Sequence, residues 1–352
     1  MKILYIGQYT KGNTSRMRGE AIKEILCPII FDVIDTNIPF FKTQRIWRTV
    51  GFRYKIGPLV QHINNYIRHQ LKEKHYDLIW VDKAVFITPK TTKLLKQTTS
   101  KLVHSTPDMA FYANKSKLFY ASLPLYDFCI TTKTIEIDIY HKYLQNPKVL
   151  FMPQGFSKKI HKPHHSFSQK EDAIVFIGLA EPSRFKVAEI ILANNLRLKI
   201  VGHGWNPFIS KYKDNKNLQF LGTAIYGEDY SRLISSSKFA LGLLSKRFSE
   251  LHTTRTFEIP ACSTALLTER NPETEMFFND DEVIFYDNYN QLISKIQYFT
   301  KHADKLKLVT EKGLRGGYNF VKKTIDLFPS FWASKKNLFT LFFHRLLKLF
   351  LA

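Results

Sequence analysis

Two glutamates around a Thr-Thr-Arg segment are the residues of this 352-residue sequence that point most directly to chemistry. Glu250 and Glu258 stand eight positions apart, and Glu258 lies inside a helix-like FEIPA run. A carboxylate at a helix end can accept hydrogen bonds from both vicinal hydroxyls of a ribose, an arrangement that a neutral side chain matches poorly. Glu258 is the candidate for that contact. Taken alone, a glutamate at such a position more often caps or pairs on a surface helix.

The residues between the two glutamates suit a phosphate group. Thr253, Thr254 and Arg255 lie where a helix N-terminus would meet phosphate oxygens, so backbone amides there would help to hold a diphosphate. A small-residue break, a buried strand and the acidic turn TERNPE follow.

The whole segment 250–278 closely resembles the donor-site motif of the group 1 (family 4-like) glycosyltransferases. The resemblance is greatest to the spore-maturation-type branch, in which HTTR, FEIPA and LLTER occur together. It implies the GT-B fold, in which two Rossmann-like domains face each other across a cleft and the C-terminal domain binds the nucleotide-sugar. It also makes Glu250 a contact for the donor sugar hydroxyls. Ser263 departs from the pattern, because many relatives have glycine there.

Two further segments resemble the same family. In FIGLAEPSR, Gly178 ends a strand and Arg184 stands where many relatives have lysine, so Arg184 is a candidate to stabilise charge on the leaving nucleotide. Lys186 is a weaker candidate, and either residue could instead be a solvated base at a helix start. In VGHGW, Gly202 and Gly204 would let the backbone approach the nucleotide.

The N-terminal half resembles the acceptor domain of the same branch in the segments WVDKAVFITP, KLVHSTPDM and LPLYDFCITTK. Loops that follow parallel strands lie at the carboxyl edge of the sheet, where ligands bind. Asp82 and Lys83 are therefore acceptor-side candidates, and His104 and Asp108 are catalytic candidates beside Glu250 and Arg184. Asp108 could instead cap a helix, and His104 could be a partly buried, satisfied histidine.

Gly7, Gly12 and the basic pair Arg16 and Arg18 follow or begin elements near the N-terminus. They could shape the floor of the cleft, so Gly7 and Arg16 join the acceptor-side candidates. The pair could equally be a solvated helix face.

Short apolar runs must position all of these residues. KILYIG, IIFDVID, DLIWVD, KLVHS, DFCITT and VLFMP recur in the first half, with room for crossover helices between them, such as 14–26. The same pattern of apolar runs begins again in the second half with AIVFIG, LRLKIVG, NLQFLG, KFALGLL, TALLTE and EVIFY. This alternation predicts α/β structure with two doubly wound parallel sheets. We expect an acceptor domain at 1–155, a linker at 156–172, a donor domain at 173–320 and an amphipathic helical tail at 321–352.

The charge balance predicts an anionic partner. Lys and Arg number 52 against 30 acidic residues, a formal net charge of +22. Basic and aromatic residues alternate through 38–75, and the tail from Lys335 is rich in Phe and Leu. Both stretches suit an anionic inner membrane leaflet that presents a lipid-linked or lipopolysaccharide-type acceptor. The tail could instead be a final helix packed across the two domains.

Several classes of protein are not expected. No apolar run approaches the roughly 20 residues that span a bilayer. The three cysteines lack disulfide or metal-ligand spacing and the N-terminus does not read as a secretory signal, so we expect a cytoplasmic protein. No Asp-x-Asp follows a buried strand, and the linker histidines His161, His164 and His165 suit a polar connection better than zinc. We therefore expect neither metal nor cofactor.

These features together predict an enzyme that transfers sugar from a nucleotide-diphosphate-sugar to a glycan, lipid-linked or lipopolysaccharide-type acceptor. The resemblance implies retention of anomeric configuration. Two alternatives stay open: a nucleotide-sugar epimerase on the same fold, and a non-enzymatic polyanion binder suggested by the charge. No DNA- or RNA-binding motif accompanies that charge, so a nucleic-acid partner is not expected.

Overall fold

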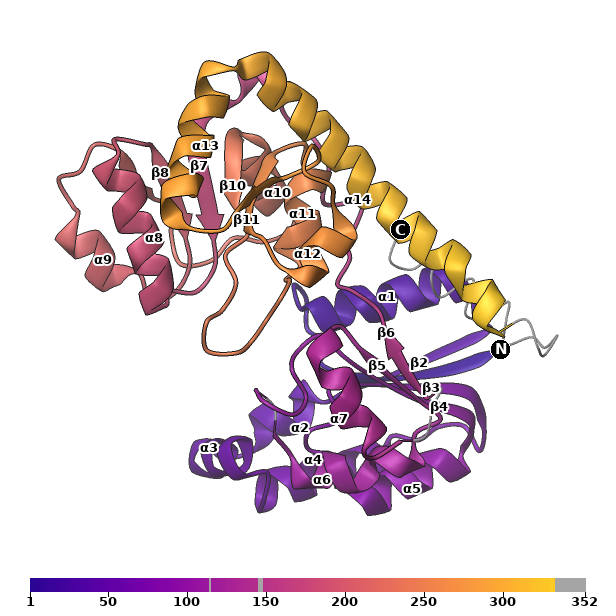
Figure 1. Cartoon of the computed structure of the whole chain (residues 1–352). Coiled ribbons are helices and arrows are strands. Elements are labelled where there is room, and N and C mark those ends of the chain that lie inside the picture. The colour runs from indigo at the N-terminus through magenta and orange to yellow at the C-terminus, as the bar shows by residue number, and fades with distance from the viewer. Residues whose placement is uncertain (114, 145–147, 333–352) are drawn as a thin grey trace. The chain divides into compact units, whose positions relative to one another are not determined.

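The chain folds as two compact units that meet in sequence between Pro153 and Gln154. A computed structural model describes residues 1–113, 115–144 and 148–332, with side chains up to residue 319. Each unit is built on its own six-stranded parallel sheet with helices between the strands (Figure 1). The predicted pair of doubly wound parallel sheets is confirmed.

The first unit has the strand order β2-β1-β3-β4-β5-β6, and every pairing in it is parallel. Its strands are β1 (Lys2–Gly7), β2 (Ile30–Asp35), β3 (Tyr76–Asp82), β4 (Thr99–Thr106), β5 (Phe128–Thr131) and β6 (Val149–Phe151). Its helices are α1 (Thr14–Leu26), α2 (Asn37–Lys42), α3 (Arg45–Tyr54), α4 (Pro58–His69), α5 (Pro89–Gln97), α6 (Lys117–Ser122) and α7 (Ile137–His141).

Helix α1 shows how local sequence sets the bounds. The Asn13 side chain accepts a hydrogen bond from the Ser15 backbone N–H and so caps the first turn. Cys27 adopts a left-handed conformation and donates its N–H to Lys23, which ends the helix. The helix therefore has the bounds predicted from its apolar spacing, and it buries Ile22 and Leu26.

The second unit has the strand order β12-β11-β10-β7-β8-β9, again with parallel pairings. Its strands are β7 (Glu171–Ile177), β8 (Leu198–Val201), β9 (Leu218–Phe220), β10 (Ser237–Leu241), β11 (Ala265–Glu269) and β12 (Ile284–Tyr286). Its helices are α8 (Pro182–Ala193), α9 (Asn206–Lys211), α10 (Gly227–Ser235), α11 (Arg255–Ala261), α12 (Pro272–Phe277), α13 (Tyr289–Lys301) and α14 (Ala303–Trp332).

Residues 154–172 belong to the second unit rather than standing apart from both. The backbone N–H groups of His164 and His165 donate to Ser235 Oγ at 2.8 and 3.1 Å. Lys162 N–H donates to Ser231 Oγ at 3.3 Å. Both serines are on α10, so the segment predicted as a linker is hydrogen-bonded to a helix of the second unit.

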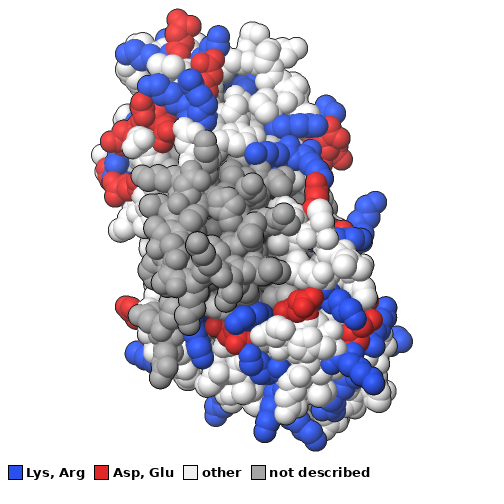
Figure 2. Space-filling view, turned by 90° about the vertical axis from the view of Figure 1, so that its right-hand side faces the viewer, with Lys and Arg blue, Asp and Glu red and all other residues white. Residues whose placement is uncertain are grey.

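The final helix, α14, extends to Trp332 (Figure 1). The predicted tail from Lys335 lies outside the described residues. Within the part of the chain that is described, no helix is both long and apolar enough to cross a bilayer. Figure 2 shows one face on which Lys and Arg side chains predominate over Asp and Glu in the N-terminal unit, as the net charge leads one to expect.

Candidate functional site

Glu258 lies on α11, and its carboxylate is held from two sides. The Tyr230 hydroxyl, from α10, donates to Glu258 Oε2 at 2.6 Å. His161 Nε2 lies 3.7 Å from Oε1, and the Glu258 side chain is 13% exposed. Burial and the Glu258 charge raise the pKa of Tyr230 well above its usual value, so the phenol stays a donor. The carboxylate is thus oriented but still reachable.

Two arginines lie together near the ends of β7 and β10. The guanidinium carbons of Arg184 and Arg255 lie 5.5 and 5.7 Å from the centre of the Phe176 ring. Arg184 donates to Leu179 O at 2.8 Å, and Arg255 to Ile177 O at 3.2 Å. Burial lowers the pKa of Arg184, and the charge of Arg255 lowers it further. The two cations therefore repel each other in a partly desolvated place.

The hydrogen-bonding capacity of this arginine pair is not filled. Among the described residues, the buried Nε atoms of Arg184 and Arg255 have no hydrogen-bond partner, and neither has Thr253 Oγ1. Glu181 offers one partial counter-charge, with Oε1 3.4 Å from Arg184 NH1. Buried donors without partners are costly, so the arrangement is one that a bound anion would stabilise.

Glu250 belongs to the same surroundings. Its charge acts on the Arg184 guanidinium, opposing the loss of pKa that burial causes. Its N–H donates to Phe248 O at 2.6 Å, within the loop between β10 and α11. The structure therefore brings Glu250, Arg184 and Arg255 together, while Thr254 stands at the N-cap of α11.

A buried pair that the sequence analysis missed fixes the loop before α11. His252 is fully buried, and its Nδ1 contacts the carboxylate of Glu273 on α12. His252 Nε2 accepts from the Gln154 N–H at 3.2 Å, so the proton is on Nδ1 and is donated to Glu273. The pair physically connects the HTTR segment with the acidic turn TERNPE.

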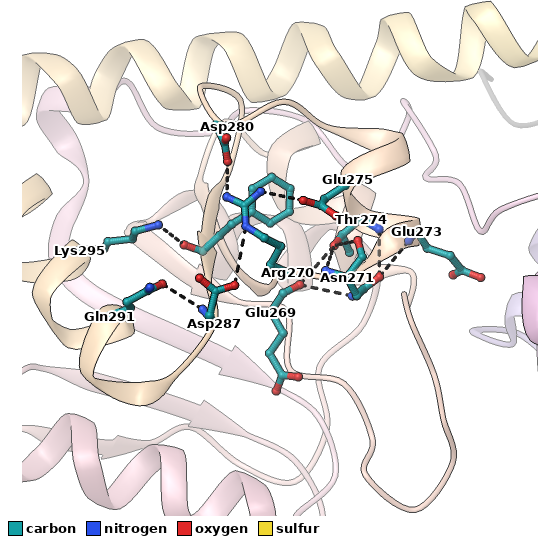
Figure 3. A network of polar contacts seen from close by, with 11 residues as sticks. Glu269, Arg270, Asn271, Glu273, Thr274, Glu275, Asp280, Asp287, Gln291 and Lys295 are labelled. Carbon is teal, nitrogen blue, oxygen red and sulfur yellow. Dashed lines mark hydrogen bonds and ion pairs between the residues drawn. The ribbon is translucent and has the colours of Figure 1, made fainter.

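Arg270 in turn orders the segment that carries Glu273 (Figure 3). It bonds Glu275 at 2.9 Å, pairs with Asp280, and covers the Phe285 ring at 4.6 Å. Asn271 caps α12 by accepting from the backbone N–H groups of Glu273 and Thr274. Figure 3 shows the Glu273 carboxylate pointing away from the Arg270 cluster. The Glu273 carboxylate contacts His252 instead.

The glycines of the second unit serve close packing of two loops. A Cβ on Gly202 would lie 1.8 Å from the carbonyl oxygen of Gly178, so the loops after β7 and β8 touch there. Gly204 has a φ of +83°, which favours glycine. Trp205 is 1% exposed and donates to Gly178 O at 2.9 Å. It therefore packs within its own unit.

Lys186 is directed away from the arginine pair. Its ammonium lies 5.5 Å from the centre of the Tyr289 ring on α13, and the side chain is exposed. Ser263 has a φ of +53°, the left-handed conformation in which the relatives' glycine is unstrained. The position thus keeps the backbone geometry although the residue differs.

In the first unit, Asp82 and Arg18 form a buried ion pair at the end of β3. Arg18 NH1 lies 3.1 Å from Asp82 Oδ2, and the Tyr5 hydroxyl lies 3.1 Å from the same oxygen. No described residue bonds the buried Asp82 Oδ1. Gly7 is needed beside them, because a Cβ there would lie 2.8 Å from Ser15 Oγ and 3.0 Å from Asp82 Cβ.

The two members of the basic pair, Arg16 and Arg18, have different surroundings. Arg16 is 42% exposed, with Nε 3.7 Å from Glu20 Oε1, and takes no part in the Asp82 cluster. Arg18, which is only 15% exposed, belongs to that cluster. The available signal was spacing: Arg18 precedes Ile22 by four residues and so shares the buried stripe of α1.

Lys83 and Asp108 meet beside that cluster. Lys83 Nζ lies 2.7 Å from Asp108 Oδ2, joining the residue after β3 to the loop after β4. Lys83 has a φ of +56°, a strained conformation for a non-glycine residue. Asp108 precedes a turn at 110–113 and caps no described helix, so that alternative for Asp108 is wrong.

His104 lies in the core of the first unit. It is 1% exposed and packs against the rings of Phe119 and Tyr126, whose centres are 4.5 and 5.5 Å away. Burial lowers the pKa of His104 to about 3, so the ring is neutral. Nδ1 has no hydrogen-bond partner among the described residues. A side chain this buried cannot contact a bound sugar, so the structure does not support the catalytic prediction.

The described residues hold no group of three or more His, Cys, Asp or Glu side chains arranged as metal ligands. Two of the linker histidines lie beside different carboxylates: His161 faces Glu258, whereas His164 Nδ1 lies 3.9 Å from Glu228.

Comparison with known proteins bears on both halves of the chain. Residues 184–323, which contain α8 and the segment 250–278, match the family described as "Glycosyl transferase-like". No curated protein matches the sequence.

Solved structures show the fold. HepE from Anabaena, solved with UDP-glucose, is 13% identical with a TM-score of 0.60, over 91% of this chain and 95% of that one. Sucrose-phosphate synthase from Thermosynechococcus elongatus is 12% identical with a TM-score of 0.62, over 95% and 100%. UDP-GlcNAc 2-epimerase from Methanocaldococcus jannaschii is 12% identical with a TM-score of 0.52, over 84% and 92%. The fold is GT-B, and the similarities together support a place in the glycosyltransferase superfamily.

Proposed function

We propose that this protein is a glycosyltransferase that moves a sugar from a nucleotide-diphosphate-sugar to a glycan, lipid-linked or lipopolysaccharide-type acceptor. The observation that carries the proposal is the pair Arg184 and Arg255, whose buried Nε atoms have no partner among the described residues, in the unit that also holds Glu258. The pair suits a diphosphate, and the oriented carboxylate suits a ribose.

Each donor-side residue has a distinct part in the proposal. Glu258 accepts from the ribose hydroxyls, with Tyr230 fixing its orientation. Arg184 and Arg255 bind the diphosphate, assisted by the hydroxyl of Thr253 and the amide of Thr254. Glu250 binds a hydroxyl of the donor sugar. As the bond between the anomeric carbon and the phosphate oxygen breaks, charge grows on that oxygen, and Arg184 stabilises it.

The acceptor is held by the first unit in this proposal. Arg18, Lys83 and Asp108 offer both donors and acceptors for sugar hydroxyls beside Gly7 and Asp82. The acceptor oxygen bonds to the anomeric carbon, and its proton passes to the leaving phosphate oxygen. This route gives retention and needs neither a metal nor a carboxylate base.

We further propose a cytoplasmic protein bound peripherally to an anionic membrane. The support is the excess of basic residues and the basic-aromatic stretch 38–75 in the first unit. A lipid-linked acceptor would be presented at such a surface.

The second candidate function is nucleotide-sugar epimerisation, because an epimerase shares the fold. The discriminating experiment incubates the enzyme with each nucleotide-sugar, with and without a lipid-linked glycan extract and with EDTA, and follows the sugar by NMR. If the protein is a transferase, the nucleotide is released only when the lipid-linked glycan extract is present, and its release continues when EDTA is added. Epimerised donor formed without extract would contradict transfer.

Variants at the arginine pair connect that assay to the site. Removing one donor to a developing negative charge typically lowers kcat by about 100- to 1,000-fold. We expect this loss for Arg184→Ala. Lys186→Ala, two residues along the same helix and directed at Tyr289, is the matched control. Equal losses in both would count against the assigned role of Arg184.

A further inference from the structure

Helix α3 turns its apolar side to solvent. At about 100° per residue, Ile46, Trp47, Val50 and Tyr54 fall on one side of the helix; we refer to these four residues as the α3 apolar face. Ile46 is 74% exposed, Trp47 44% and Tyr54 59%, and Val50 is half-buried. An ordinary surface helix places such a stripe against the core. This helix does the opposite.

Gly51 explains how the helix is attached. It is the one buried residue of α3, and a Cβ on it would lie 2.5 Å from Leu59 Cβ on α4. The helix therefore packs on its neighbour through its smallest residue, leaving the larger side chains outside. Figure 1 shows α3 at the periphery of the N-terminal unit. The exposure of the apolar face is thus built into the packing.

Cations surround the α3 apolar face. The sequence from 36 to 72 contains no acidic residue, whereas Lys42, Arg45, Arg48, Arg53 and Lys55 lie on or next to α3. Several of them rest on exposed rings. The Arg48 guanidinium is 5.5 Å from the Phe41 ring centre, and Lys55 Nζ is 4.5 Å from that of Phe52.

This combination identifies the partner by its chemistry. An apolar stripe with a tryptophan, bordered by cations and without anions, matches the boundary between acyl chains and anionic headgroups. A nucleic acid would satisfy the cations but not the apolar face. A second copy would set cations against cations.

We propose that the α3 apolar face, with the cations around it, docks on an anionic lipid bilayer. The inference rests on the proposed membrane association and names the element and surface that perform it. It does not depend on donor chemistry, because every residue involved lies in the first unit.

The test uses the full chain and vesicles of phosphatidylcholine with or without phosphatidylglycerol. We expect co-sedimentation with the anionic vesicles only, weakened by salt. The triple variant Ile46→Ser, Trp47→Ser, Tyr54→Ser should bind at least tenfold more weakly, with an unchanged thermal melting temperature because these side chains are exposed. The matched control is Ile29→Ser with Tyr112→Ser, which removes exposed apolar side chains elsewhere in the same unit.

Tryptophan fluorescence locates the contact. In a Trp332→Phe background, Trp47 is the exposed tryptophan, since Trp80 and Trp205 are each 1% exposed. Brominated anionic lipid should quench its emission. The proposal would be overturned if the triple variant bound vesicles as well as the wild type, or if the brominated lipid did not quench Trp47. It would also be overturned if the triple variant lost self-association or nucleic-acid binding and kept vesicle binding. Glu258→Ala should bind vesicles like the wild type, which separates this result from failure of the donor site.

Discussion

The Tyr230 hydroxyl donates a 2.6 Å hydrogen bond to Glu258 Oε2, so a residue of α10 sets the direction of the carboxylate on α11. A carboxylate has about four acceptor positions, and Tyr230 occupies one. His161 Nε2 lies 3.7 Å from the other oxygen, Oε1, and among the described residues no further side-chain hydrogen bond to this carboxylate is found, so acceptor positions remain for the two hydroxyls of a ribose. Orientation of this kind lowers the entropy cost of binding, because the carboxylate need not be ordered when the nucleotide arrives.

Replacing Tyr230 with phenylalanine tests this relationship. A hydrogen bond to a charged group contributes about 1.5–3 kcal/mol, so we expect donor affinity to fall by roughly tenfold or more. Calorimetric titration with the donor would measure it. Tyr226→Phe, at an exposed position before the same helix, is the control. Equal affinity of Tyr230→Phe and wild type would show that Glu258 needs no such support.

The His252–Glu273 pair predicts a large loss of stability when one partner is removed. A hydrogen bond to a charged group contributes about 1.5–3 kcal/mol, and both side chains are almost fully buried. Glu273→Ala should therefore lower the free energy of unfolding by about that amount. Glu275→Ala, on the same helix but 47% exposed, should cost at most about 1 kcal/mol. Urea denaturation would compare them, and similar values would contradict the buried role of Glu273.

Arg18 and Arg16 form a second matched comparison. Arg18 pairs with the buried Asp82, whereas Arg16 faces Glu20 at the surface. We expect Arg18→Ala to raise the KM for acceptor several-fold and to leave donor affinity unchanged. Arg16→Ala should change neither. Loss of donor binding in Arg18→Ala would mean that the first unit is damaged more widely or that the assignment is wrong.

The buried His104 predicts a dependence of stability on pH. Burial lowers its pKa from 6.5 to about 3, so between these values the unfolded chain binds a proton that the folded protein does not. The free energy of unfolding should then fall as pH decreases below 6.5, by at most about 1.4 kcal/mol per pH unit from this residue. His104→Leu should show a shallower decline in urea denaturation between pH 7 and 4.5. Parallel declines would contradict the assignment.

The alternation of strands and helices was predictable because period and length alone distinguish buried strands from amphipathic helices. The hydrogen-bond and ion-pair partners of the site residues could not be predicted from the sequence. Tyr230 and His161 reach Glu258 from separate segments, and sequence spacing carries no information about such tertiary contacts. His104 was assigned to a strand end, but β4 continues through Thr106 and keeps it inside. The position of Arg18 could be predicted from the sequence, because Arg18 precedes Ile22 by four residues and so lies on the buried stripe of α1.

Ligand-induced thermal stabilisation measures binding at the proposed donor site. Thermal unfolding would be followed with UDP-, GDP-, dTDP-, ADP- and CMP-sugars for the wild type, for Glu258→Ala and for Glu189→Ala, a surface glutamate of the same unit. A ligand at 100 times its Kd stabilises the folded state by about 2.7 kcal/mol. We expect a selective rise in Tm that Glu189→Ala keeps and Glu258→Ala loses. A rise that survives in Glu258→Ala would contradict the proposed donor site, and so would no rise with any nucleotide-sugar in the presence of acceptor extract.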